Sequence, residues 1–112
     1  MAIYVNTDDS QGLLDSIYAA IDEGSIQTWA YDEDKDFLHD TSDGQWEGEA
    51  WLHPTVGKSA LVLNVIPPTK GVSMEAYAVY HGRFIEMLLA HFDEGFSEAF
   101  ATARATGDDR IN

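Results

Sequence analysis

SMEAYAVYHGRFIEMLLAHFDEGFSEAFATA, residues 73–103, is the stretch that decides the fold of this 112-residue chain. Its aromatic and long aliphatic residues recur every three or four positions, as on a helix that buries a broad face. They are Tyr77, Tyr80, Phe84, Ile85, Met87, Leu88, Leu89, Phe92, Phe96 and Phe100. Ser73 is a good N-cap residue. We therefore predict a long helix from Ser73 to about Ala103. Gly82 and Gly95 each cost roughly 1 kcal/mol within it, which leaves a kink or an early end near Gly95 open.

The preceding residues predict the layer that covers this helix. Asp9 or Ser10 caps a first helix, which Gly24 ends. Alternation and a high content of β-branched and aromatic residues predict three strands. These strands are Ser25–Asp32, Trp46–His53 and Ser59–Ile66, and Pro67 and Pro68 end the last of them. Two segments stay open: Met1 to Thr7 is either a short extra strand or a loosely packed leader, and Phe37–His39 is a brief strand end.

The order of the predicted elements defines the fold class. A helix, three antiparallel strands and a long C-terminal helix make a two-layer α+β domain (αβββα) with both helices on one face of the sheet. The whole chain, residues 1–112, is expected to be one domain, because it is long enough for a single core and too short for two. Residues from about 104 to 112 are polar and are expected to form a flexible tail.

Charge is the outlying property of the composition. Twenty acidic residues against six Lys and Arg give a formal net charge of −14, and residues 1–56 carry 13 of the acids but only one base, Lys35. Such a field repels nucleic acid and anionic membranes and attracts basic surfaces, so we expect no direct binding to either. The N-terminus lacks the pattern of a signal peptide, and no apolar run is long enough to cross a bilayer, which indicates a soluble, cytoplasmic protein.

The acidic run that begins at Asp32 imitates part of a calcium-binding loop. Asp32, Asp34, Asp36, Asp40 and Asp43 occupy spacings at which an EF-hand places oxygen ligands. The loop nevertheless has Phe37 where the sharp turn needs glycine, and an aspartate where the bidentate glutamate belongs. We therefore predict a solvated acidic turn and no bound metal or other cofactor.

No pattern of residues specifies a reaction. The chain has no cysteine, and His39, His53, His81 and His91 show no metal-ligand spacing. His81, Arg83 and Glu86 fall within about one helical turn, but such a group is more often a surface ion pair than an acid–base site. We assign no catalytic residues and expect the protein not to be an enzyme.

The acidic segment from Asp32 to Glu49 is the predicted functional surface. Carboxylates along an exposed hairpin can imitate the phosphates of a nucleic acid, and aromatic residues beside them can anchor a partner. The candidate partner-binding residues are Asp32, Glu33, Asp34, Asp36, Asp40, Asp43, Trp46, Glu47, Glu49 and Trp51. The hypothesis is a small interaction protein that inhibits or neutralises a basic, nucleic-acid-handling protein, as inhibitors, immunity proteins and anti-defence proteins do.

The competing hypothesis is a housekeeping or small-molecule-binding α+β domain. Its acidity would then serve only solubility, or reflect a high-salt organism, and its long helix would complete the core of a homodimer.

Overall fold

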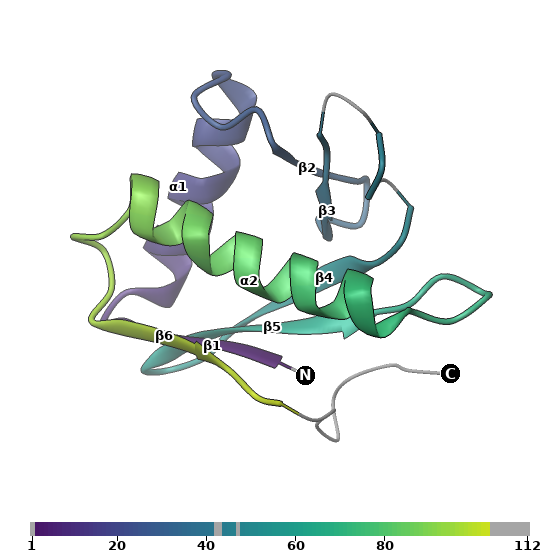
Figure 1. The fold of residues 1–112 in the computed structure, drawn as a ribbon. Coiled ribbons are helices and arrows are strands. Elements are labelled where there is room, and N and C mark those ends of the chain that lie inside the picture. The colour runs from purple at the N-terminus through teal and green to yellow at the C-terminus, as the bar shows by residue number, and fades with distance from the viewer. Residues whose placement is uncertain (1, 42–43, 47, 104–112) are drawn as a thin grey trace.

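The computed structural model describes residues 2–41, 44–46 and 48–103 and shows two helices packed on one curved antiparallel sheet (Figure 1). The strands lie in the order β2-β3-β4-β5-β1-β6. The strands are β1 (Ala2–Asn6), β2 (Trp29–Tyr31), β3 (Phe37–His39), β4 (Trp51–Val56), β5 (Ala60–Ile66) and β6 (Glu98–Ala101), and the helices are α1 (Ser10–Asp22) and α2 (Met74–His91). The predicted class was wrong, because the sheet has six strands and not three.

The largest error lies at the end of the predicted long helix. Helix α2 ends at His91, and a turn in which the Gly95 N–H donates to the Phe92 carbonyl, at 2.8 Å, reverses the chain. The early end near Gly95 is thus confirmed. The residues that follow run back as β6 alongside β1 and do not continue the helix. The threefold and fourfold spacing of Phe92, Phe96 and Phe100 fits a helix, but pairing with β1 overrides it.

The N-terminal segment is a central strand. β1 lies between β5 and β6, and Ile3 and Val5 on it are fully buried beneath the helices. The extra-strand alternative for residues 1–7 is therefore confirmed. Because the segment is short, the sequence did not indicate that β6, the C-terminal edge strand, pairs with it.

The predicted strands are displaced or shortened. Ser25–Asp32 contributes only the three residues of β2, and Phe37–His39 forms a strand of its own, which pairs with all three. The Glu49 N–H donates to the Trp46 carbonyl ahead of the strand, and β4 starts only at Trp51, later than predicted. Pro54 is tolerated within β4 because β3 pairs with β4 only at Phe37 and Leu52, so that the side of Pro54 away from β5 has no neighbouring strand.

Several other local predictions are confirmed, whereas the expected tail at residues 104–112 lies outside the described residues. Asp9 caps α1, its carboxylate accepting from the Gly12 N–H at 2.9 Å, and Gly24 follows the helix at φ 85°. Ser73 caps α2, and β5 matches its predicted range to within one residue. Both helices lie on the same face of the sheet, as expected (Figure 1).

An aromatic cluster forms the centre of the core. Trp29 of β2 meets Tyr80 and Phe84 of α2 edge-on, with ring centroids 5.5 and 5.0 Å apart. Phe37 of β3 packs between Phe84 and Tyr18 of α1, at 5.2 and 5.0 Å. This cluster fixes β2 and β3, and the acidic turn between them, against both helices.

Candidate partner-binding surface

The run from Asp32 to Asp36 is an ordered turn between β2 and β3. One carboxylate oxygen of Asp32 accepts from the N–H groups of both Asp34 and Asp36, each at 3.0 Å. Backbone bonds from Lys35 N–H to the Asp32 carbonyl and from Asp32 N–H to the Asp36 carbonyl close the turn, with Lys35 at φ 67°. The side chains of Glu33 and Asp34 are consequently exposed at its tip.

Two tyrosines hold this turn against α1. The Tyr18 hydroxyl donates to the Lys35 carbonyl at 2.6 Å, and the Tyr31 hydroxyl donates to the Asp22 carboxylate at 2.5 Å. The Lys35 ammonium lies 5.0 and 4.6 Å from the two ring centroids, within cation–π range. The turn therefore joins the acidic side of α1 in one surface.

We call this region the acidic turn surface: Asp15, Tyr18 and Asp22 of α1, Tyr31, and the turn residues Asp32, Glu33, Asp34 and Lys35. Asp15 and Asp22 were missed by the sequence prediction. Their spacing from Tyr18, three residues before it and four after it, puts all three on one side of α1, and this signal could have found them.

The surroundings of the two tyrosines raise their pKa values. Burial, followed by the negative charge of Asp36 and smaller contributions from Tyr31, Asp15 and Asp32, raises the pKa of Tyr18 to about 12. The hydrogen bond to Asp22 is the main cause that raises the pKa of Tyr31. Both phenols stay protonated at neutral pH, so they remain hydrogen-bond donors within the acidic field.

Asp36 is only 8% exposed and contributes to the structure of the turn. Its carboxylate accepts from the His53 Nδ1 of β4 at 2.6 Å, and this bond links the turn to the next strand. The predicted contact residue therefore stabilises the turn from within.

The rest of the predicted surface lies elsewhere. Asp40 is exposed at the far end of β3, and Glu49 is half-buried, 3.4 Å from the Lys70 ammonium. Trp46 is buried in the core, where its carbonyl accepts from the Tyr80 hydroxyl at 2.6 Å. Trp51 is half-buried, and its side chain lies on the other face of the sheet from that of its neighbour Leu52. Asp43 and Glu47 fall outside the described residues.

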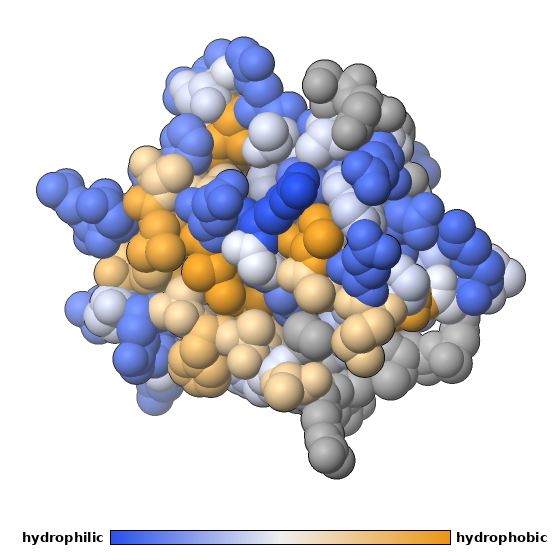
Figure 2. All heavy atoms as spheres, viewed as in Figure 1, coloured by the Kyte–Doolittle hydropathy of each residue, from blue (hydrophilic) through white to orange (hydrophobic). Residues whose placement is uncertain are grey.

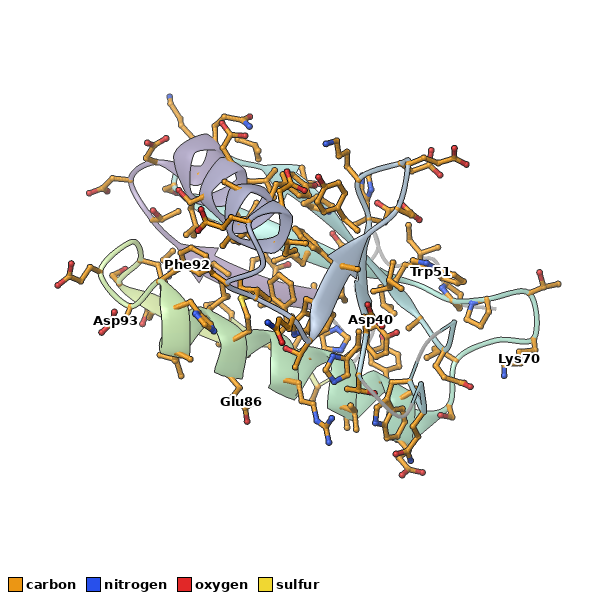
Figure 3. The ribbon with its side chains drawn as sticks, turned by 90° about the horizontal axis from the view of Figure 1, so that it is seen from above. Asp40, Trp51, Lys70, Glu86, Phe92 and Asp93 are labelled. Carbon is orange, nitrogen blue, oxygen red and sulfur yellow. The ribbon has the colours of Figure 1, made fainter. Side chains whose placement is uncertain are left out.

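The structure thus divides the predicted segment into two parts. The turn at residues 32–36 is bonded to α1 through Tyr18, whereas Trp46 is bonded to Tyr80 of α2. Figure 3 shows Trp51 and Lys70 on the side of the N-terminal end of α2, with Phe92 and Asp93 at its other end. Among the described residues, only the first part groups exposed carboxylates, those of Glu33 and Asp34, beside the half-buried Asp32.

The same turn contains a cluster of oxygen ligands. Asp32, Asp34 and Asp36 each offer a carboxylate oxygen, and these lie within 4.8 Å of one another. The hydrogen bonds to Asp32 from the turn and to Asp36 from His53 compete with any cation for those oxygens. The geometry alone does not define a metal site.

The grouping of His81, Arg83 and Glu86 does not persist as one cluster. His81 is buried, with its Nδ1 2.6 Å from the Tyr77 carbonyl oxygen. Arg83 reaches instead to β3, where it lies 3.1 Å from the Nε2 of His39. His39 donates from Nδ1 to the Thr28 carbonyl at 2.8 Å, and burial lowers its pKa, so that Nε2 accepts from Arg83.

An open groove lies at the other end of the sheet. About 640 Å³ in volume, it separates the β1–α1 connection from the α2–β6 loop, and its lining includes Thr7, Asp8, Glu94 and Phe96. The Thr7 hydroxyl donates across it to the Gly95 carbonyl at 2.7 Å, which ties the two loops together. No catalytic set of side chains converges on its described lining.

Comparisons with family models, curated proteins and solved structures find no match to this chain. Within residues 2–41, 44–46 and 48–103, neither helix is both long and apolar enough to span a membrane.

Proposed function

We propose that the chain is a small acidic interaction protein that binds a basic, nucleic-acid-handling partner through the acidic turn surface. The observation that carries the proposal is the convergence of carboxylates from α1 and from the β2–β3 turn around Tyr18 and Tyr31. Lys35, the basic residue of this turn, is held over the two tyrosine rings. The five acidic residues of the acidic turn surface outnumber this one ammonium group, so the surface remains negative.

The chemistry of this surface suits Lys and Arg side chains of a partner. Exposed carboxylates accept charge-assisted hydrogen bonds, which are stronger than neutral ones, and the tyrosine rings add flat apolar area beside them. A nucleic-acid-binding protein presents such side chains in the channel that binds phosphates. By filling that channel, the acidic turn surface would compete with nucleic acid, and the partner would be inhibited.

The ordered turn strengthens the proposal. Because Asp32 and the Tyr18 hydroxyl already fix the backbone of residues 32–36, little conformational entropy is lost when a partner binds. The acidic run thus differs from a flexible solvated loop in having its exposed carboxylates placed in advance.

The test begins with capture of basic proteins from a lysate of the source organism, followed by purified binding measurements on the captured protein. The test variant is Glu33→Gln with Asp34→Asn, in which both replaced residues are exposed in the turn. The matched control is Asp93→Asn with Glu94→Gln, which removes the same two charges from an exposed turn at the other end of α2 (Figure 3).

We expect the test variant to weaken binding, mainly through slower association, while the control keeps near-native affinity. Binding to the native chain should also weaken as salt rises, because opposite charges are screened over about 8–10 Å at physiological ionic strength. Nucleic acid should displace the protein from the captured partner. Equal effects of the two double variants, or no competition by nucleic acid, would contradict the proposal.

A further inference from the structure

An uncharged, apolar face lies along α2 and β6, at the opposite edge of the sheet from the acidic turn. Figure 2 shows apolar side chains gathered along α2 and over the strand below it. Met74 and Leu89 are 72% and 57% exposed on α2, and Phe100 is 48% exposed on β6. We call this region the α2–β6 face: Met74, Ala78, Ile85 and Leu89 of α2, with Ala99, Phe100 and Ala101 of β6.

Helical geometry assigns the α2 residues to the side of the helix nearest β6. At 3.6 residues per turn, Met74, Ala78, Ile85 and Leu89 lie within roughly 60° of one another around the helix axis. Arg83 projects from the other side and contacts His39 of β3. Since β3 and β6 lie in opposite halves of the sheet, the apolar row borders β6.

β6 is the edge of the sheet and lacks two of the usual protections against pairing. Edge strands are commonly blunted by lysine or proline, and β6 (EAFA) contains neither. Its only charge, on Glu98, accepts a hydrogen bond from the Asn6 side chain at 2.7 Å. On its helix side β6 carries only Ala99 and Ala101, so another strand can approach closely.

The pairing of β6 with β1 fixes which backbone groups face outward. The Thr102 N–H donates to the Ala2 carbonyl at 2.9 Å. Because the backbone groups of alternate residues point to opposite sides of an antiparallel strand, those of Phe100 also point to β1. The N–H and C=O groups of Ala99 and Ala101 therefore point away from the sheet.

We propose that the α2–β6 face binds a second copy of this chain, with β6 pairing antiparallel to β6 of the copy about a two-fold axis at Phe100. In this register Ala99 exchanges backbone hydrogen bonds with Ala101 of the copy, and the two Phe100 residues are directly opposite. The Phe100 ring is already stacked on Tyr4, with centroids 5.2 Å apart, so the two stacks meet across the axis. Two six-stranded sheets become one.

Charge favours a second copy over a basic partner at this face. Each copy carries −14 and would repel another at most surfaces, but the α2–β6 face contains no charged residue. A basic partner would leave its own charges unpaired against Leu89, Ala101 and Phe100. A second copy presents the same apolar side chains, and its β6 offers N–H and C=O groups that pair with those of Ala99 and Ala101.

The first experiment measures the mass in solution from micromolar to hundreds of micromolar protein by sedimentation and light scattering. We expect a dimer that tightens as salt rises, because salt screens the repulsion between two acidic copies. Ala101→Pro removes an outward N–H without touching the bonds to β1, and it should raise the dimer dissociation constant about tenfold or more. A second pair of variants, Leu89→Lys and its matched control Val56→Lys, tests the α2 part of the face.

Leu89→Lys should weaken the dimer, whereas Val56→Lys makes the same charge change at a 43% exposed site away from this face and should not. The register has its own test, because the chain contains no cysteine. Two residues directly opposite in a non-hydrogen-bonded antiparallel pair have Cα atoms about 4.5 Å apart, within reach of a disulfide. Phe100→Cys should therefore form a disulfide-linked dimer on mild oxidation, and Val56→Cys should not.

A chain that remains monomeric across the concentration range would overturn the proposal. So would a dimer unaffected by both Ala101→Pro and Leu89→Lys, or a Phe100→Cys variant that cross-links no more than Val56→Cys. These outcomes are independent of the acidic turn surface, since the opposite response to salt separates the dimer from binding to a basic partner.

Discussion

Replacing Tyr80 with Phe should destabilise the fold through two buried backbone groups. Tyr80 is fully buried, and its hydroxyl donates to the Trp46 carbonyl at 2.6 Å and accepts from the His39 N–H at 3.2 Å. It therefore connects α2 to the loop before β4 and to β3. Phe keeps the ring that packs edge-on against Trp29 but removes both hydrogen bonds.

The loss of stability in Tyr80→Phe depends on the backbone groups that lose their hydrogen bonds to the hydroxyl. A buried donor that loses its partner costs about 1–3 kcal/mol, and Tyr80→Phe leaves the His39 N–H in this state. The Trp46 carbonyl still accepts from the Glu49 N–H at 3.3 Å, so loss of its bond to Tyr80 adds only about 1 kcal/mol. Partial relaxation or an entering water would recover some of this energy, so we expect a loss of about 2–4 kcal/mol. That is a large share of the roughly 5–15 kcal/mol by which such domains are stable.

Urea denaturation of the native chain and the variant measures this difference directly. Tyr4→Phe is the matched control, because the Tyr4 ring lies on the open face of the sheet and its hydroxyl has no hydrogen bond to a described residue. The control should change the free energy of unfolding by less than about 0.5 kcal/mol. A similarly small effect of Tyr80→Phe would refute the assigned position of the hydroxyl.

Three further predictions test the core and the turn. Because burial lowers the pKa of His39 below the ordinary value of 6.5, the unfolded chain binds more protons than the native chain as the pH falls below that value. The free energy of unfolding should therefore decrease between pH 7 and pH 5. In denaturation measured over this range, the decrease should be smaller for His39→Gln than for the native chain. Leu88→Ala, at a fully buried position of α2, should cost on the order of 2–5 kcal/mol in urea denaturation, and a loss below about 0.5 kcal/mol would contradict its place in the core. Millimolar calcium should shift the melting temperature no more than equal magnesium, because one carboxylate oxygen of Asp32 and one of Asp36 are already hydrogen-bonded and the loop lacks the glycine and the bidentate glutamate of a calcium site; a calcium-selective rise would make the turn a metal site.

Local signals explain which parts of the fold the sequence predicts. The caps at Asp9 and Ser73 and the stop at Pro67 act on neighbouring backbone groups, so they can be read without knowledge of the fold. The strand β6 has no such signal. Its residues become a strand only because β1, almost a hundred positions earlier, offers hydrogen bonds to them, and a spacing that also suits a helix conceals this.

The candidate surface follows the same rule. That Glu33 and Asp34 would be exposed in a turn follows from composition alone. The burial of Asp36 depends on His53, and that of Trp46 depends on Tyr80, which are 17 and 34 positions away. Neither contact has a local pattern, so an acidic residue and an aromatic one were assigned to a binding surface when both serve the interior.

The order of the strands makes the two proposed interactions compatible with each other. The acidic turn follows β2 at one edge, and β6 is the other edge, so a dimer joined through β6 would place its two acidic surfaces at the outer ends of one continuous sheet. Repulsion between them would then be weak, because the distance across both sheets, at about 4.8 Å per strand, far exceeds the screening length of about 8–10 Å. Such a dimer could bind two basic partners, or two sites on one, without a conformational change. Segregating charge from apolar area in this way would allow a chain of net charge −14 to associate with itself, and each copy would keep the proposed attraction for a basic protein.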